Sequence, residues 1–173
     1  MLAFVTIGST RFDDLVQSVF SPTVLSSLLQ KGYTHIVVQC GNSEFPYAHL
    51  LAGGEELFQV EKEGVSIECW KFKPSLQMDY DRADLVISHA GSGTILDVLR
   101  LEKPLIVVPN PTLLDNHQEE LAFELQKLGH LESSTVSRLT QTIQEFDPSG
   151  LVKFPSFDGS KFANLLDEEM GFL

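Results

Sequence analysis

The sequence predicts an α/β protein whose single domain is built on a doubly wound, mostly parallel sheet. Short apolar runs rich in Val and Ile alternate along the chain with longer stretches in which apolar residues recur at helical spacing. The runs are largely apolar throughout, which is typical of parallel strands that helices cover on both faces. Strand and helix in repeated alternation therefore indicate a Rossmann-like architecture.

Six short runs are predicted strands. The first is mostly apolar, and the Gly-Ser-Thr turn that follows it marks its end. The second places Ile36, Val37 and Val38 in a row. The predicted strands are Ala3–Ile7, His35–Gln39, Val65–Trp70, Leu85–Ser88, Leu105–Val108 and a short Leu131–Ser134.

Helical spacing places the predicted helices between these strands. The first helix ends before Pro22, because proline cannot continue a helix that precedes it. Segment 41–64 contains Gly, Pro and scattered charges, and predicts a variable loop with some local helix. The predicted helices are Phe12–Phe20, Thr23–Gln30, Pro74–Arg82, Thr94–Leu101, Asn116–Leu128, Val136–Phe146 and Lys161–Met170.

The composition argues against several classes of function. Twelve Lys and Arg against 24 Asp and Glu leave a formal net charge of −12, whereas nucleic acids and anionic membranes attract basic patches. A phosphorylated ligand remains compatible, because backbone amides at a helix start bind phosphate without basic side chains. No apolar run approaches the ~20 residues of a membrane span. Cys40 and Cys69 form no Cys-x-x-Cys pair and are expected to be buried free thiols.

The loops that follow the predicted strands are where a ligand is expected. In doubly wound sheets, ligands bind beyond the carboxyl ends of the strands. These loops are 8–12, 72–75, 89–94 and 109–118.

Loop 89–94 has the composition of an anion site. Gly91 and Gly93 allow a sharp turn and close approach of a ligand, and Ser92 or Thr94 is expected to cap the helix that follows. The start of that helix presents unpaired N–H groups and a partial positive charge, which suits a diphosphate. The alternative is an ordinary strand-to-helix turn with a Ser or Thr cap.

His89 and Asp97 flank this loop. His89 ends a strand, where its ring could donate to a phosphate oxygen, although a single histidine is more often structural. Asp97 lies in the first turns of the helix, where it could accept two ribose hydroxyls or simply compensate the helix dipole.

The spacing of these residues resembles a known donor-site motif. His89-x-Gly-x-x-Thr-x-x-Asp97 is similar to the His-x-Gly-x-x-Ser-x-x-Glu motif of GT-B glycosyltransferases that use UDP-sugars, with Asp in place of the usual, longer Glu. Nearly the whole chain resembles the donor-binding half of the MurG-like GT-B family. The resemblance continues through Lys103–Pro109 and Asp115–Glu119.

This resemblance implies a role for each remaining candidate. Gly8, Ser9 and Thr10 would face the diphosphate from the opposite side, although a plain turn explains them too. Phe72 would flank the uracil or else pack in the core. The candidates for contacts with the sugar hydroxyls and acetamide, or for a helix cap with solvent-facing neighbours, are Asn116, His117 and Gln118.

The resemblance also implies the chemistry. The resemblance to eukaryotic members of this family implies an inverting transfer of GlcNAc from UDP-GlcNAc to dolichol-diphosphate-GlcNAc, in the synthesis of N-glycan precursors. Departing UDP would be held without a metal ion or other cofactor by the helix start and nearby hydroxyls, since the chain has no Asp-x-Asp placed for manganese. His89 and His117 are the candidate catalytic residues, with His89 assigned to phosphate and the general base left open.

The length of the chain implies a partner. A GT-B enzyme has two Rossmann-like domains, and 173 residues suffice for one. We expect a nucleotide-sugar-binding domain at 1–160, and at 161–173 an amphipathic helix that docks on a partner or on its own sheet. The resemblance implies a membrane-anchored acceptor subunit that recruits the chain to the cytosolic face of the endoplasmic reticulum.

Three alternatives remain open. One is a subunit of a bacterial-type polysaccharide glycosyltransferase, which shares the motif and the division into two chains. Another is a non-catalytic module that binds a nucleotide sugar. The third, a flavodoxin-like regulatory domain, leaves the spacings within 89–97 and 115–118 unexplained.

Overall fold

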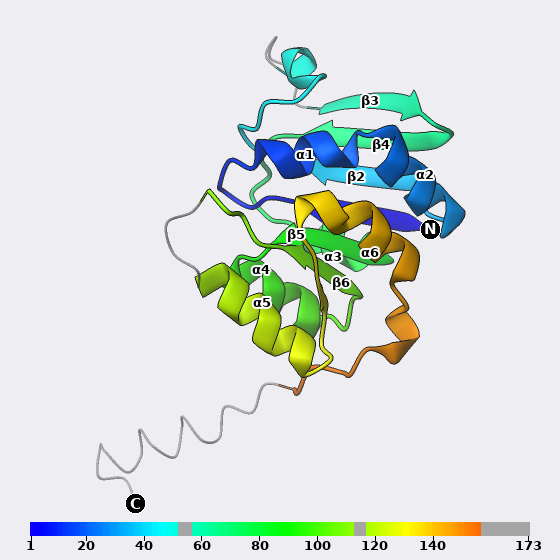
Figure 1. Cartoon of the computed structure of the whole chain (residues 1–173). Coiled ribbons are helices and arrows are strands. Elements are labelled where there is room, and N and C mark those ends of the chain that lie inside the picture. The colour runs from blue at the N-terminus through cyan, green and yellow to red at the C-terminus, as the bar shows by residue number, and fades with distance from the viewer. Residues whose placement is uncertain (52–56, 113–116, 157–173) are drawn as a thin grey trace, which may run out of the picture.

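The computed structural model describes residues 1–51, 57–112 and 117–156. A seven-stranded sheet, in the order β3-β4-β2-β1-β5-β6-β7, forms the middle of three layers (Figure 1). Strands β4, β2, β1, β5, β6 and β7 pair in parallel, and only β3 is antiparallel to its neighbour. The predicted α/β class with a mostly parallel, doubly wound sheet is confirmed.

The strands coincide closely with the apolar runs of the sequence. β1 pairs with β2 on one side and with β5 on the other, so the connections reverse direction at β1. The strands are β1 (Leu2–Thr6), β2 (His35–Gln39), β3 (Leu57–Lys62), β4 (Val65–Trp70), β5 (Leu85–His89), β6 (Leu105–Val108) and β7 (Glu132–Ser133).

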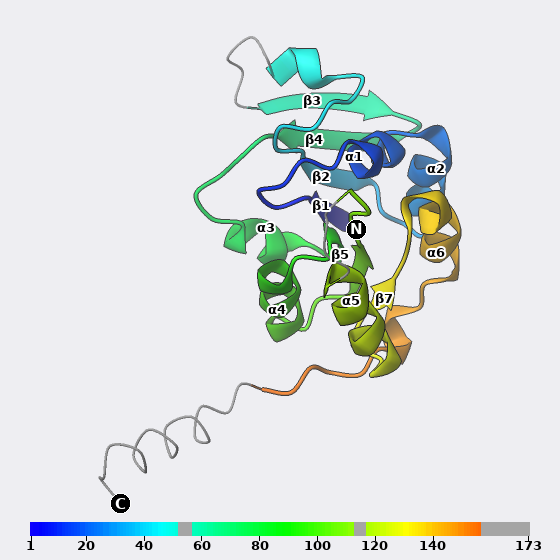
Figure 2. The same ribbon diagram turned by 60° about the vertical axis from the view of Figure 1, so that its left-hand side comes forward.

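Helices cover both faces of the sheet. Helices α1, α2 and α6 lie on one face, and α3, α4 and α5 lie on the other (Figures 1 and 2). The α-helices are α1 (Asp13–Val19), α2 (Pro22–Gln30), α3 (Gln77–Arg82), α4 (Ser92–Arg100), α5 (His117–Lys127) and α6 (Leu139–Glu145). Short 3-10 turns are η1 (Ala48–Leu51), η2 (Val136–Arg138) and η3 (Pro148–Gly150).

Alternate residues of each central strand enter two separate cores. In β1, Ala3 and Val5 pack beneath α1 and α2, whereas Phe4 points to the opposite face and contacts Trp70 and Tyr80. Because both faces are covered, neither set of side chains needs to be polar. This double burial is the physical reason for the apolar runs that identified the strands.

The prediction of a variable loop at 41–64 is wrong for its second half. Residues Leu57–Lys62 form β3, which pairs with β4 in an antiparallel hairpin. The turn between them uses left-handed backbone at Glu63 (φ 52°) and Gly64 (φ 76°). Three stacked rings, from Phe20, Phe45 and Phe58, cover the hairpin.

The predicted helix bounds are corrected by a few residues. Ser21 caps α2 by accepting a hydrogen bond from Val24, so this helix begins at Pro22. α3 starts at Gln77, not at Pro74, and the predicted helix at Val136–Phe146 is a 3-10 turn followed by α6. The predicted terminal helix and docking segment, 161–173, lie outside the described residues.

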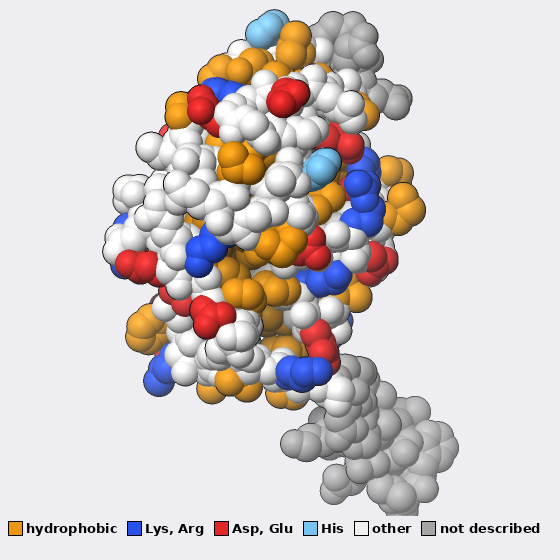
Figure 3. Space-filling view, turned by 90° about the vertical axis from the view of Figure 1, so that its right-hand side faces the viewer, with side chains coloured by type: hydrophobic (Ala, Val, Ile, Leu, Met, Phe, Trp, Pro, Cys, Tyr) orange, Lys and Arg blue, Asp and Glu red, His pale blue; other side chains and the backbone are white. Residues whose placement is uncertain are grey.

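The two ends of the strands differ in their surroundings. The edge opposite the carboxyl ends, which faces the viewer in Figure 3, mixes acidic, basic and hydrophobic side chains. At the carboxyl edge lie the loops in which the sequence analysis expects a ligand. Within the described residues, no helix is long and apolar enough to cross a bilayer.

Candidate functional site

The reversal of strand order at β1 brings two predicted loops together. β1 and β5 are neighbours in the sheet, so the turn after Thr6 and the turn after His89 leave the same edge side by side. Such a switch point, where the loops diverge to opposite faces, is the usual place for a ligand in an open α/β sheet. Gly8–Thr10 and Gly91–Thr94 therefore form one candidate site.

His89 lies at the centre of this site, between two glycines. Its side chain is 6% exposed, and its Nδ1 has no hydrogen-bond partner among the described residues. A Cβ atom on Gly8 would lie 2.5 Å from Cε1 of the ring, and one on Gly91 would overlap Nε2. Glycine at both positions is therefore a steric condition for this placement of the imidazole.

Burial determines the protonation state of this ring. Burial lowers the pKa of His89, with opposition from the backbone of Thr6. The imidazole is therefore neutral at pH 7, and it carries one N–H donor and one acceptor nitrogen. A buried nitrogen without a partner is costly to a fold. A nitrogen without a partner that lies beside the turns after β1 and β5 is typical of a binding site.

Helix α4 begins at the same place with its backbone groups uncapped. Gly91, not Ser92 or Thr94, is the N-cap residue, and no side chain caps the helix, so the predicted Ser or Thr cap is wrong. Ser92 and Gly93 are exposed, and a Cβ on Gly93 would have no neighbour within 4 Å. No side chain caps the first N–H groups of the helix, and two of the first residues are exposed, as an anion site requires.

Thr94 and Asp97 continue along α4. Thr94 is half-buried, and burial raises the pKa of Tyr80, an effect that the nearby Thr94 side chain opposes. Asp97 is exposed on the helix surface. Its carboxylate is therefore free to meet a ligand that lies along the first turns of α4.

The turn after β1 faces this helix start. Gly8 has a φ of +63°, which favours glycine independently of its contact with His89. The hydroxyl of Thr10 donates to the carbonyl of Ile7 at 3.1 Å, so its oxygen remains able to accept. Ser9 is exposed and points out of the packed core.

Phe72 follows β4 at the same edge. The ring is 53% exposed, so the alternative of core packing does not describe it. Gly41 lies next to it, since a Cβ there would be 3.5 Å from Cζ of the ring. An exposed aromatic ring at this edge is available for stacking on a base.

The second predicted cluster is only partly assembled. Asn116 lies outside the described residues. Oε1 of Gln118 accepts a hydrogen bond from the backbone of Asn110 at 3.1 Å, so this oxygen is committed to holding the loop. His117 is 83% exposed at the start of α5, and its Nδ1 lies 3.8 Å from Oε2 of Glu120.

Two buried amides at this edge were not identified from the sequence. Asn110 donates to the carbonyl of Arg11 at 3.1 Å and thereby ties the loop after β6 to the loop after β1. Gln39, at the end of β2, joins the loops after β1 and β4. A polar residue at the carboxyl end of an otherwise apolar strand was the available signal, and it is a weak one.

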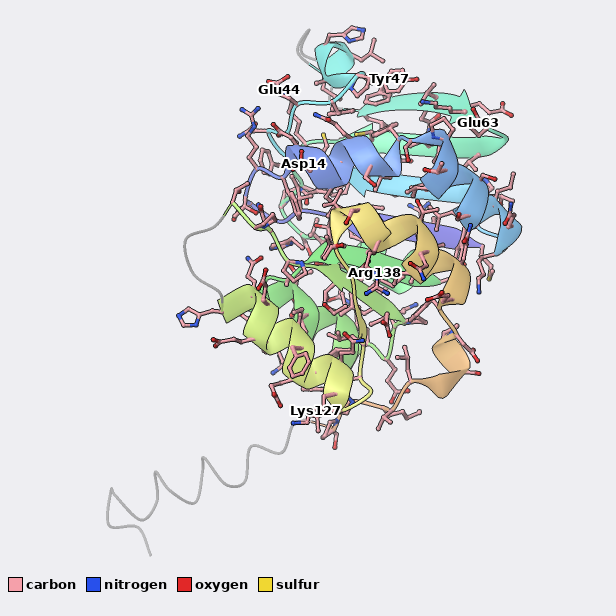
Figure 4. All side chains as sticks on the ribbon, in the orientation of Figure 1. Asp14, Glu44, Tyr47, Glu63, Lys127 and Arg138 are labelled. Atoms are coloured by element: carbon pink, nitrogen blue, oxygen red, sulfur yellow. The ribbon has the colours of Figure 1, made fainter. Side chains whose placement is uncertain are left out.

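A separate groove lies farther along the same edge. Its volume is about 1110 Å³, and Asp14 of α1 and Arg138 of η2 border it (Figure 4). Phe123 of α5 also lines the groove and is 63% exposed. The lining includes none of the residues around His89.

Metal-binding chemistry has no counterpart in the described ranges. They contain no group of three or more His, Cys, Asp and Glu residues arranged to hold a metal ion. Cys40 and Cys69 are buried free thiols, as the sequence predicted.

The site and the fold define the class of the protein. Residues 2–168 match the family described as the glycosyltransferase family 28 C-terminal domain, and the sheet has the arrangement of the C-terminal half of GT-B glycosyltransferases. Within this class, the chain belongs to the family of ALG13 UDP-N-acetylglucosamine transferase subunits. The ALG13 subunit of Cryptococcus neoformans is 34% identical over 191 residues, which cover 97% of this chain and 96% of that protein.

Other relatives differ greatly in length. The ALG13 subunit of Homo sapiens is 41% identical over 137 residues, which cover 79% of this chain but 11% of the human protein. The chain therefore spans about a tenth of that relative and nearly all of the fungal one.

Solved structures support the same assignment. A solution structure of ALG13 superposes with a TM-score of 0.68 at 31% identity, and the match covers 95% of this chain and 94% of that chain. Acinetobacter baumannii MurG superposes with a TM-score of 0.61 at 20% identity, over 86% of this chain and 42% of that one. The likeness to MurG concerns the fold alone.

Proposed function

We propose that this chain is the donor-binding subunit of a two-chain enzyme in N-glycan precursor synthesis. The enzyme transfers GlcNAc from UDP-GlcNAc to dolichol-diphosphate-GlcNAc with inversion at the sugar carbon. The observation that carries the proposal is the neutral, buried His89 between two glycines, beside the uncapped start of α4. The near full-length likeness to a UDP-N-acetylglucosamine transferase subunit supports UDP-GlcNAc as the donor.

The proposed roles follow the positions of the residues. The diphosphate lies between the N–H groups of Ser92, Gly93 and Thr94 and the turn at Gly8–Thr10, and neutral His89 donates to it. These donors stabilise the negative charge that develops on UDP as the sugar leaves, so no metal ion or other cofactor takes part.

The remaining residues would hold the two ends of the donor. Asp97 accepts from the ribose hydroxyls, with a water molecule in between where its short side chain does not reach. Phe72 stacks on the uracil. Asn116 and the amide nitrogen of Gln118 contact the sugar, while Oε1 of Gln118 keeps its bond to Asn110.

We propose that the acceptor side comes from another polypeptide. The relatives are named as subunits, and this chain corresponds to less than half of the MurG chain. We propose a membrane-anchored, Alg14-like subunit that binds the lipid-linked acceptor and holds the complex at the cytosolic face of the endoplasmic reticulum. Segment 161–173 is the proposed docking element.

The general base acts in the complete cleft that the two chains form together. His117 stays a candidate, because it is exposed at the carboxyl edge of the sheet and free of buried partners. A base supplied by the acceptor subunit fits the same arrangement, since the acceptor hydroxyl approaches from that side.

A transfer assay tests the proposal. The purified chain should bind UDP-GlcNAc in a calorimetric titration yet transfer no GlcNAc to a lipid-diphosphate-GlcNAc acceptor. Addition of membranes that carry the acceptor subunit should restore transfer. Binding without transfer in the presence of the partner would instead indicate a non-catalytic module, and absence of binding would refute the proposed donor site.

A further inference from the structure

Gln39 occupies an unusual position at the end of β2. Its side chain is 2% exposed, yet every hydrogen-bonding group of its amide is used. Oε1 accepts from the hydroxyl of Thr6 at 2.7 Å and from the N–H of Ile7 at 3.1 Å. Nε2 donates to the carbonyls of Gly8 and Lys71, both at 2.9 Å.

These four partners permit only one orientation of the amide. Two donors face Oε1 and two carbonyl oxygens face Nε2, so a flipped amide would oppose like groups on both sides. The network extends one step further, because the N–H of Gly8 donates to the Thr6 hydroxyl at 3.2 Å. Both polar backbone groups of Gly8 are thus determined directly or indirectly by Gln39.

The two loops that Gln39 joins are those that flank the proposed nucleotide. Gly8 begins the turn assigned to the diphosphate, and its backbone packs on the His89 ring. Lys71 immediately precedes Phe72, which is assigned to the uracil. No backbone pairing joins these two loops in the described sheet, since β1 and β4 are separated by β2.

The loop after β4 has a second anchor beyond Phe72. The Nζ atom of Lys73 lies 3.1 Å from the carboxylate of Asp79 and 4.0 Å from the centre of the Trp70 ring. Phe72 therefore lies between a residue held by Gln39 and a residue held by Asp79. Its ring is exposed between these two anchored neighbours.

We propose that Gln39 is a positioning residue that sets the spacing between the diphosphate turn and the uracil loop, and so pre-forms the donor site. The inference rests on the proposed function, because it concerns how that site is held. Gln39 itself touches no substrate. It acts by placing Gly8, and with it His89, at a defined separation from Phe72.

The substitution Gln39→Glu tests this role with little change of volume. The new carboxyl keeps one accepting oxygen but opposes the carbonyls of Gly8 and Lys71 with the other. We expect the affinity for UDP, measured by calorimetry on the full chain, to fall about tenfold or more, the factor that one lost hydrogen bond of good geometry can carry. Gln39→Met, which has no amide and no charge, should behave similarly.

A matched control separates positioning from general loss of stability. Ser27 is also buried and hydrogen-bonded, but it lies between α2 and α6. Ser27→Ala should lower the melting temperature without changing the affinity for UDP. All titrations are made well below the melting temperature of each variant.

Two further measurements address the loops themselves. Trp70 is the only tryptophan and contacts Lys73, so its fluorescence reports on the loop after β4. Its emission should shift in Gln39→Glu and not in Ser27→Ala. In a double-mutant cycle, Phe72→Ala should cost less affinity in the Gln39→Glu background than in the wild type, because the ring is already displaced there.

The outcomes distinguish this inference from the function on which it rests. Failure of the wild-type chain to bind UDP would refute the donor site itself. Wild-type binding together with unchanged affinity in both Gln39 variants, or strict additivity with Phe72→Ala, would overturn the inference alone. Failure of one Gln39 variant to fold leaves the other variant to decide.

Discussion

At the scale of single residues, His89 connects the packing of the fold with its proposed chemistry. The ring is buried against Gly8 and Gly91, its Nδ1 lacks a partner within the described chain, and burial lowers its pKa. A charged imidazole would be a stronger phosphate donor, but burial without a counter-charge disfavours it. Because the folded chain keeps the His89 ring neutral, its free energy of unfolding should depend on pH.

The free energy of unfolding should fall as the pH falls below about 6.5, the ordinary pKa of histidine in an unfolded chain. In that range the unfolded state gains a proton on His89 that the folded state, with its lowered pKa, does not bind. The contribution is fully present above this pH and is lost toward pH 5. Urea unfolding of wild type and His89→Gln between pH 5 and 7.5 checks this, and an identical pH dependence in both would contradict it.

Asp97 provides a second prediction for a single residue. Because it is exposed on α4, Asp97→Ala should change the free energy of unfolding by less than about 0.5 kcal/mol. It should nevertheless weaken UDP binding severalfold if the carboxylate meets the ribose. Glu124→Ala, at an exposed position on α5, is the control for both quantities. A large loss of stability in Asp97→Ala would identify a structural residue instead.

At the scale of secondary-structure elements, the hairpin of β3 and β4 extends the sheet away from the site. Pairing of β4 with β2 joins it to the rest of the sheet, and Phe20, Phe45 and Phe58 stack over it with centroids 5.1 to 6.5 Å apart. β3 pairs along β4, which carries Trp70 and the loop beyond it at the carboxyl edge.

Removal of the Phe58 ring should lower the stability of the chain but leave its affinity for UDP nearly unchanged. Phe58→Ala should destabilise the chain by about 3 kcal/mol, the lower range for a buried aromatic side chain replaced by Ala. The affinity for UDP should stay within twofold of wild type, because β3 lies at the sheet edge away from β1 and β5. Chemical denaturation and calorimetry on the same samples test both statements, and a parallel loss of affinity would show that the hairpin positions the site.

At the scale of the whole molecule, the carboxyl edge of the sheet forms half of the proposed cleft. The donor loops converge at the switch point beside β1, and the described residues hold no cluster for a metal ion. Under the proposed function, the charge on the leaving diphosphate is met by helix amides and the His89 ring.

Metal-independent catalysis is the corresponding prediction. Excess EDTA should leave both UDP binding by the chain and GlcNAc transfer by the complex within about twofold of their untreated values, since dipoles and a neutral ring replace the usual cation. Manganese added after EDTA should produce no gain. A loss of transfer on chelation that manganese restores would place a metal ion in the mechanism.

Local pattern and chain connectivity explain what could be predicted. The strands at His35–Gln39 and Leu105–Val108 were predicted to the residue, because parallel strands buried on both faces are largely apolar. Their alternation with helices specifies the doubly wound class, and the class places the loops after β1 and β5 at one edge. Order and spacing thus pointed to His89, Gly91 and Asp97 as candidates, and the family resemblance suggested their roles.

Tertiary structure decided what depends on non-local partners. β3 forms because it pairs with β4 and packs against rings from distant parts of the sequence, such as Phe20. No hydrophobic periodicity within its own residues indicates this. Gly91 begins α4 without a side-chain cap, which local preference for Ser or Thr did not foresee. The enclosure of His89 and the four bonds of Gln39 depend on loops more than 30 residues apart, so only the folded chain could reveal them.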